Sequence, residues 1–187
     1  MLPPYRAEPY SDFTDPRIAD RYQQALRGVR ASFGERAMLI VGGTRTDTKA
    51  SIESINPADP SEVIGTAASA AVSDVDAAID AAWAAFPNWS RRTAEERAGL
   101  IHRVGDLIAD RRFDFAAWQT FEAGKNWAEA VADVDEAIDF CRYYAHQALR
   151  MAEPIEVHDF EGEMNKSWLQ AIGAGVVIPP WNFPLAI

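Results

Sequence analysis

Residues 176–187, VVIPPWNFPLAI, place a single amide side chain inside an otherwise apolar run. The first three residues are typical of a strand buried on both faces of a parallel sheet. Proline fixes its own φ angle and restricts the residue before it, so the loop around Asn182, framed by Pro180 and Pro184, is expected to be stiff. Folds of the α/β class hold ligands just beyond the carboxyl ends of such strands.

Asn182 suits such a position because its NH₂ group donates a hydrogen bond without adding charge. A neutral donor of this kind can stabilise a developing oxyanion. The alternative interpretation is that Asn182 caps nearby backbone groups, as asparagine does in many loops. The residue pattern by itself is compatible with both.

The composition is that of a globular protein with an acidic surface. The chain has 187 residues, 48% of them hydrophobic, and a formal net charge of -10. Such a surface repels phosphate groups, which argues against nucleic acids and anionic membranes as main partners. No apolar run approaches the roughly 20 residues of a membrane span. The first residues lack the pattern of a secretory signal, and the single cysteine excludes an internal disulfide, so a cytoplasmic location is expected.

The first third of the chain predicts a helix followed by short strands. Apolar residues recur at helical spacing from Ile18 to Val29. Asp15 is the expected N-terminal cap and Gly34 the expected terminator of this helix. The strand signals that follow are a hairpin turning at residues 42–43 and two short strands at about 51–55 and 62–67.

Three amphipathic helices are predicted next, at about residues 73–86, 93–112 and 127–151. Ser73, followed by Asp76, resembles a capping box for the first of them, and Pro87 is expected to end it. Thr93 and Glu96 form the full capping box of the second. After these helices, the pattern of residues 154–172 predicts a β-hairpin with its turn near 161–162, and glycines at 173 and 175 are expected to turn the chain into the strand before Asn182.

Other candidate sites carry less chemistry. Cys141 lies on the apolar face of the third predicted helix, as a small buried hydrophobic residue would. Gly124-Lys125 resembles part of a phosphate loop, but a helix end with a C-terminal glycine explains it better. The three histidines, His102, His146 and His158, lack the spacing of metal ligands, so no metal site is expected.

Several segments in order resemble the N-terminal part of an aldehyde dehydrogenase. INPADPSEVIGTAASA is similar to the first strands of that family, and GVVIPPWNFPLAI to its Pro-Trp-Asn-Phe-Pro motif. FEAGKNWAEAVADVDEAIDFCRYYA and the helix before LIVGGTRTDT resemble most the branch that oxidises L-glutamate γ-semialdehyde to glutamate in proline catabolism. The resemblance covers nearly all 187 residues and implies an α/β fold with a Rossmann-like dinucleotide-binding sheet.

The resemblance also implies a reaction and a set of site residues. Family members oxidise an aldehyde through attack by a cysteine, with NAD or NADP as hydride acceptor. Asn182 would be the catalytic oxyanion donor, and Glu122 would lie near the α-amino group of the substrate. The expected cofactor neighbours are Ile178, Pro179, Pro180 and Trp181.

Four parts are expected along the chain: an N-terminal helical extension (1–35), a mostly helical part of the NAD-binding domain (36–153), a β-hairpin oligomerisation arm (154–172) and the truncated start of the dinucleotide-binding sheet (173–187). The hairpin implies a homo-oligomer. Cys141 does not match the nucleophile motif of the family, so the nucleophilic cysteine and the general-base glutamate are expected outside these residues. The 187 residues alone are therefore expected to be inactive.

Two alternatives remain at this stage. The first is another aldehyde dehydrogenase, acting on succinate semialdehyde or an aliphatic aldehyde, or the similar domain of the bifunctional proline-utilisation enzyme, which would need a long N-terminal extension. The second is a non-catalytic helical interaction module with an acidic surface. In that case no ordered site would surround Asn182, and its replacement by alanine would be silent.

Overall fold

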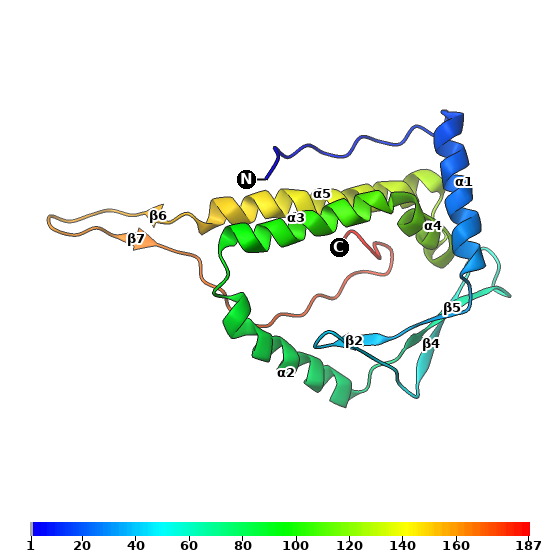
Figure 1. The fold of residues 1–187 in the computed structure, drawn as a ribbon, viewed down its shortest axis with the longest axis horizontal. Coiled ribbons are helices and arrows are strands. Elements are labelled where there is room, and N and C mark those ends of the chain that lie inside the picture. Colours follow the sequence, from blue (N-terminus) through cyan, green and yellow to red (C-terminus); the bar gives the residue numbers. More distant parts are fainter. Residues whose placement is uncertain (1) are drawn as a thin grey trace.

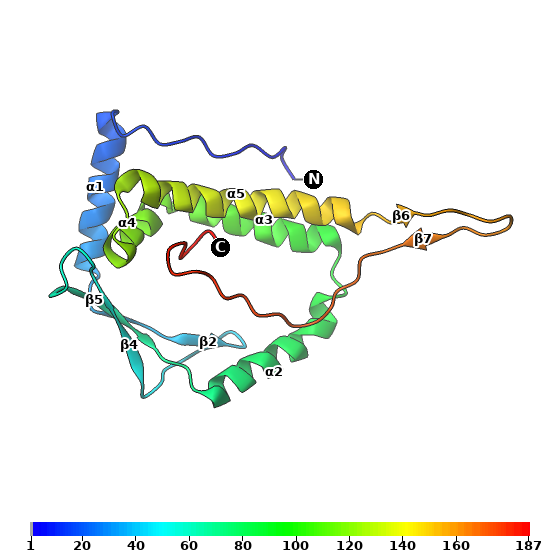
Figure 2. The same ribbon diagram turned by 180° about the vertical axis from the view of Figure 1, so that it is seen from behind.

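The computed structural model describes residues 2–187 of the chain. Two long helices, α3 (Ala94–Asp110) and α5 (Trp127–Ala152), lie side by side, as both views show (Figures 1 and 2). Helix α1 (Pro16–Ala31) crosses one end of this pair, and α4 (Arg112–Ala123) lies at the same end. The mixed helix and strand content confirms the predicted α/β class.

The core lies where α1, α4 and α5 meet. Its centre is Tyr22 of α1, which is fully buried and whose hydroxyl lies 2.7 Å from the hydroxyl oxygen of Thr120 on α4. As predicted, Asp15 caps α1 by accepting a hydrogen bond from the backbone N–H of Arg17. The residues buried with Tyr22 are Ala116, Ala130, Val131, Val134 and Ile138.

A glycine allows α3 and α5 to approach closely. A Cβ atom at Gly105 would lie only 3.0 Å from the Cβ of Cys141 on α5. Helix α3 begins with the predicted capping box: the Thr93 hydroxyl accepts from the N–H of Glu96, and the Glu96 carboxylate accepts from the N–H of Thr93. Helix α4, by contrast, was not predicted as a separate element.

A three-stranded sheet lies beside the end of α1. Strand β5 (Val63–Ala68) pairs antiparallel with β4 (Ser51–Ile55) and parallel with β1 (Glu35–Ala37). The predicted hairpin is formed by β2 (Leu39–Val41) and β3 (Thr44–Thr46), with both turn glycines at positive φ. The pairing of β1 with β5 is an addition to the predicted strands.

Helix α2 (Val72–Trp89) differs from its prediction at both ends. The structure shows Ala71 as the N-cap, and the Asp74 carboxylate accepts from the Ala71 N–H, so the expected cap at Ser73 is wrong. Pro87 lies inside the last turn of α2, so the expectation that it ends the helix is wrong; the helix continues to Trp89.

The expected hairpin extends away from the helices (Figure 1). Strand β6 (Ile155–Glu156) pairs antiparallel with β7 (Lys166–Ser167), and the turn contains Gly162 at positive φ. The hairpin prediction is confirmed, although the paired strands are short.

The C-terminal segment runs from the hairpin past α2 and back to the region of α3 and α4 (Figures 1 and 2). Residues 176–178 were expected to form a strand, but they pair with no strand among residues 2–187, so this prediction is wrong for the described chain. Their apolar side chains are exposed, Ile178 by 87%. A strand exists only through its hydrogen-bonded neighbour, and no described segment supplies one here.

The N-terminal segment follows the α3–α5 pair in an extended form (Figure 1). Glu8 forms ion pairs with Arg112 at the start of α4 and with Arg142 on α5. Three residues before Glu8, the ring of Tyr5 packs edge-on against that of Tyr143, with 5.5 Å between their centroids. These contacts join the first residues of the chain to its middle.

Candidate functional site

The FEAGKN segment forms the corner between α4 and α5. Gly124 ends α4 in the left-handed conformation, with a φ angle of 67°. The side chain of Asn126 caps α5 by accepting a hydrogen bond of 2.9 Å from the Glu129 N–H. The interpretation of Gly124-Lys125 as a helix end is therefore confirmed, and the corner fixes the direction in which Lys125 leaves the backbone.

Lys125 has a largely buried side chain with two partners. Its ammonium nitrogen lies 3.2 Å from Oδ1 of Asp133, a carboxylate on α5 whose side chain is only 1% exposed. The same nitrogen lies 5.1 Å from the centre of the Phe183 ring. One ammonium group thus joins the α4–α5 corner to the Pro-Trp-Asn-Phe-Pro segment.

That segment forms a tight turn. The N–H of Phe183 donates to the carbonyl oxygen of Pro180 at 3.2 Å, which closes the turn over Trp181 and Asn182. Beyond the turn, Leu185 packs against the buried core cluster and the next residue is buried. The turn is therefore anchored from its C-terminal side.

Asn182 itself is exposed at the tip of this turn. The four expected cofactor neighbours, residues 178–181, are exposed as well, Trp181 by 84%. The structure thus brings these five residues together on one open, proline-stiffened turn. Within residues 2–187, nothing covers them.

Glu122 lies on a different side of the same corner. It is exposed at the end of α4, and its carboxylate accepts a hydrogen bond of 3.3 Å from the Ser54 hydroxyl on β4. It borders a hollow of about 370 Å³ between α4 and the three-stranded sheet, lined also by Trp118, Arg36 and Arg45. Glu122 is three residues before Lys125, whose ammonium group contacts Phe183 in the turn that carries Asn182.

Asp133 was missed by the sequence reasoning, and so was the inward direction of Lys125. A signal for Asp133 was available, because a carboxylate between Val131 and Val134 interrupts the apolar face of α5. A buried carboxylate requires a cation or hydrogen-bond donors. Lys125, eight residues earlier, was a candidate cation.

The remaining candidates are consistent with structural roles. Cys141 is half-buried against α3, and burial raises the pKa of its thiol, which disfavours the reactive thiolate. His102 lies 3.3 Å from the carboxylate of Asp106, and His146 lies 2.8 Å from the backbone oxygen of Pro3. Among residues 2–187, no group of three or more potential metal ligands converges.

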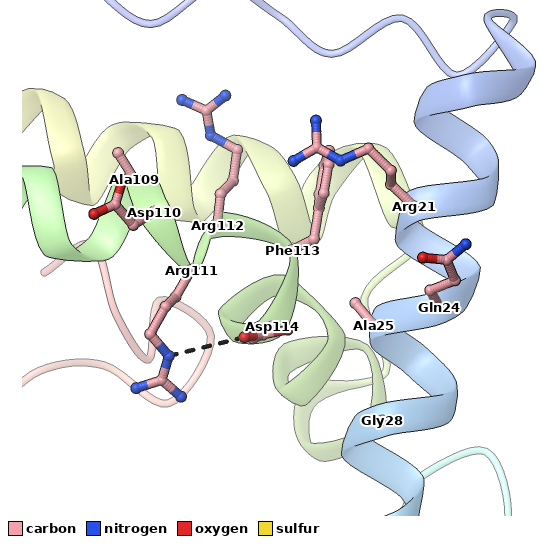
Figure 3. Close-up of a pocket in the computed structure, with 10 residues that line it drawn as sticks. All are labelled: Arg21, Gln24, Ala25, Gly28, Ala109, Asp110, Arg111, Arg112, Phe113 and Asp114. Atoms are coloured by element: carbon pink, nitrogen blue, oxygen red, sulfur yellow. Dashed lines mark ion pairs between the residues drawn. The ribbon is translucent and has the colours of Figure 1, made fainter.

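A separate hollow of about 380 Å³ lies between α1 and the start of α4 (Figure 3). Its cations are already engaged. Arg21 lies over the ring of Phe113 at 5.0 Å, and Arg111, which points away from Arg21, lies 3.8 Å from Asp114. Arg112 pairs with two carboxylates that do not line the hollow. The three guanidinium groups therefore do not converge on a common ligand.

No helix in the described part of the chain combines the length and apolar character needed to cross a membrane.

Comparison with known proteins gives a consistent result. The 1-pyrroline-5-carboxylate dehydrogenase of Geobacillus thermodenitrificans is 43% identical over 187 residues, which are 100% of this chain and 36% of that protein. A Thermus 1-pyrroline-5-carboxylate dehydrogenase with bound NAD superposes with a TM-score of 0.96 at 45% identity, over 99% of this chain and 36% of its own. Proline utilization A from Bdellovibrio bacteriovorus superposes with a TM-score of 0.93 at 32% identity, over 98% of this chain and 19% of its own.

The chain thus spans about 36% of the length of the curated relatives it matches. The structural superpositions confirm that its fold is that of the N-terminal part of these enzymes. Residues 44–187 match the model of the aldehyde dehydrogenase family. This range includes both the α4–α5 corner and the Asn182 turn. The chain therefore belongs to the aldehyde dehydrogenase family.

Proposed function

We propose that these residues form part of a dehydrogenase that oxidises L-glutamate γ-semialdehyde to glutamate with NAD, a step of proline catabolism. The observation that carries the proposal is the contact of Lys125 with Phe183. It joins the FEAGKN segment, which resembles the semialdehyde branch, to the Pro-Trp-Asn-Phe-Pro motif, which resembles the family in general. The names of the relatives support the same substrate, because 1-pyrroline-5-carboxylate is the cyclic form of this semialdehyde.

Asn182 is the proposed oxyanion donor. Its position at the tip of a stiff turn lets the NH₂ group face a substrate without being drawn into the core. A fixed neutral donor stabilises negative charge on a former carbonyl oxygen by about 3–4 kcal/mol in the transition state. The exposure of the amide within residues 2–187 leaves it accessible for that role.

The proposed cofactor surface is the face formed by Ile178, Pro179, Pro180 and Trp181. Its exposed apolar side chains fit the flat ring of a nicotinamide, which supplies the hydride acceptor when NAD is bound. NADP is the alternative acceptor. The Thermus relative with bound NAD favours NAD, and comparison of the two coenzymes at equal concentration tests the choice.

Glu122 is the proposed partner of the substrate's α-amino group. Glu122 is exposed and, among residues 2–187, its carboxylate accepts one hydrogen bond, from Ser54, so it can accept another donor. We also retain the division of the chain at 1–35, 36–153, 154–172 and 173–187, with residues 154–172 as an arm for homo-oligomer formation. The exposed Phe160 and Met164 near its tip support that role.

The test of this function uses residues 1–187 joined to the remaining part of the Geobacillus relative, which supplies the rest of an aldehyde dehydrogenase. We expect NADH formation from glutamate γ-semialdehyde. Asn182→Ala should lower kcat by about 100- to 1,000-fold with KM little changed, because an oxyanion donor acts in the transition state. Val177→Ala, on the same segment, is the matched control.

A kcat for Asn182→Ala equal to that of the parent would refute the oxyanion role. A clear preference for succinate semialdehyde would instead replace the proposed substrate with that of the first alternative. Residues 1–187 by themselves should form no NADH, because Cys141 is half-buried and its pKa is raised by that burial.

A further inference from the structure

The Lys125–Asp133 pair is an ion pair placed inside a packed region. The Lys125 side chain is 13% exposed and that of Asp133 is 1% exposed. Among the described residues, neither carboxylate oxygen of Asp133 has a hydrogen-bond donor in good geometry, so the ammonium at 3.2 Å is its main compensation. Removing water from both groups is costly, and well-packed apolar residues in their place would often be equally stable. Stability alone therefore does not explain the pair.

The position of the ammonium explains it better. A cation within about 6 Å of an aromatic ring centre is attracted to the face of the ring. Lys125 meets this condition with Phe183, at 5.1 Å. Because Asp133 lies on a rigid helix, it fixes where the ammonium sits, and the ammonium in turn fixes where the Phe183 ring sits.

Phe183 transmits this position to the turn. Its N–H closes the turn by bonding to Pro180, and it directly follows Asn182 in the chain. It is half-buried, whereas residues 176–182 are exposed, so it is the first anchored residue after the exposed stretch. Leu185 packs against the core cluster, but it is three residues beyond Asn182. It therefore restricts the turn less than Phe183, which directly follows Asn182.

We infer that Lys125 is a positioning residue: held by Asp133, its ammonium sets the Phe183 ring and thereby the orientation of the turn that carries Asn182. The ammonium is buried and already neutralised, so it does not act as an anion-binding group. The consequence for catalysis rests on the proposed role of Asn182, but the positioning itself does not.

The first experiment measures hydrogen exchange of the Phe183 amide in the 187-residue chain. Lys125→Met alone would leave a buried charge on Asp133 and can unfold the chain, so the informative variant is Lys125→Met with Asp133→Asn. We expect its Phe183 amide to exchange about 2- to 30-fold faster, the range set by a cation–π contact of partly desolvated groups. The amide of Val134, in the core part of α5, should exchange as in the parent.

Phe183→Leu tests the same contact from the side of the ring, because it keeps an apolar side chain and the ion pair but removes the ring face. It should produce the same increase in exchange at position 183, and combining it with the double variant should add little. Lys125→Arg in the parent, with Asp133 unchanged, keeps a cation at this position. Its Phe183 amide should therefore exchange as slowly as that of the parent. Equal exchange of the Phe183 amide in the parent and the double variant, or fast exchange already in the parent, would overturn the inference.

The second experiment separates positioning from the proposed function. In the fusion with the Geobacillus relative, the double variant should lower kcat with KM little changed, as Asn182→Ala does. Faster Phe183 exchange together with an unchanged kcat would support the positioning role of Lys125 and count against the oxyanion role of Asn182. Unchanged exchange with a lowered kcat for Asn182→Ala would do the reverse.

Discussion

At the scale of single residues, three consecutive positions of the α4–α5 corner have three different structural roles. Gly124 supplies a left-handed conformation, Lys125 a buried cation and Asn126 a helix cap. Each role depends on a different property of the residue. An exchange of any of the three with its neighbour would remove at least one of these contacts or the conformation of Gly124.

Gly124→Ala should destabilise the chain. The left-handed conformation costs a residue with a side chain about 1–3 kcal/mol, and the new Cβ would lie 3.0 Å from Cγ of Pro57. Denaturant unfolding measures the loss. Gly28→Ala is the control, because Gly28 lies inside α1 with nothing within 4 Å of a new Cβ, and alanine there should stabilise by about 0.5–1 kcal/mol. Equal effects of both changes would refute the conformational argument.

Asp135 should make stability depend on pH. Burial raises the pKa of its carboxyl from 3.8 to about 6, although Arg112, whose Nε lies 2.7 Å away, opposes the shift. The folded state therefore holds this proton more tightly than the unfolded state. The contribution of Asp135 to the free energy of unfolding is fully present below about pH 4 and falls by about 3 kcal/mol in total as the pH rises through about 6.

The measurement compares the free energy of unfolding of Asp135→Asn with that of the parent from pH 4 to pH 7. Asparagine stays neutral, so the variant should gain stability relative to the parent as the pH rises. Asp20→Asn, an exposed change on α1, should give no such trend. A difference between Asp135→Asn and the parent that is constant with pH would contradict the assignment.

At the scale of elements, sequence patterns located a helix best where a cap and an apolar face agreed. The capping box at Thr93 identified the start of α3, and Asp15 that of α1. Helix α4 was missed because its N-cap, Arg111, makes no side-chain cap and its aromatic residues blur the helical pattern. The N-cap of α2 was misplaced because it is an alanine, Ala71, which has no capping side chain. The backbone N–H of Ala71 donates to the carboxylate of Asp74, whereas the sequence pattern pointed to Ser73 as the cap.

This difference between α2 and α3 can be measured. Thr93→Ala removes a side chain that accepts from the Glu96 N–H, and should cost about 1 kcal/mol in thermal or denaturant unfolding. Ser73→Ala should be nearly neutral, because Ser73 lies inside α2, one residue past its first position. A loss of similar size at Ser73 would show that the sequence-based cap was right after all.

The candidate site was predictable in part, and for a physical reason. The Asn182 motif and the FEAGKN segment were both recognisable, since stiff turns and helix ends have strong local signatures. Their meeting through Lys125 and Phe183 was not, because it joins positions far apart in sequence. Likewise, residues 176–178 carry a strand pattern, yet pairing requires a neighbouring strand that local sequence cannot specify.

At the scale of the whole molecule, the most evident property is a large exposed apolar surface. A groove of about 520 Å³ runs between α2, β2 and residues 174–177, lined by Val75, Ile79 and Trp83 among others. Val176 and Val177 beside it are exposed by 77% and 82%. Monomeric soluble proteins rarely leave contiguous apolar surface of this kind uncovered.

The 187-residue chain should therefore self-associate in solution. We expect the weight-average mass in sedimentation experiments to rise with protein concentration. Val177→Glu should reduce this rise, because a charge within the apolar surface is costly to bury. Tyr10→Glu, at an exposed position that does not line the groove, is the control and should leave association unchanged. A monomer at all concentrations would contradict this expectation.

The ion pairs of Glu8 also set an order of events during synthesis. Arg112 and Arg142 follow Glu8 by 104 and 134 positions, so during synthesis Glu8 has neither ion-pair partner until the middle of the chain has been made. At about 5–20 residues per second, that delay lasts several seconds or more. During this interval the segment around Glu8 lacks both of its ion pairs, and it can lie along the α3–α5 pair only after α5 has been made.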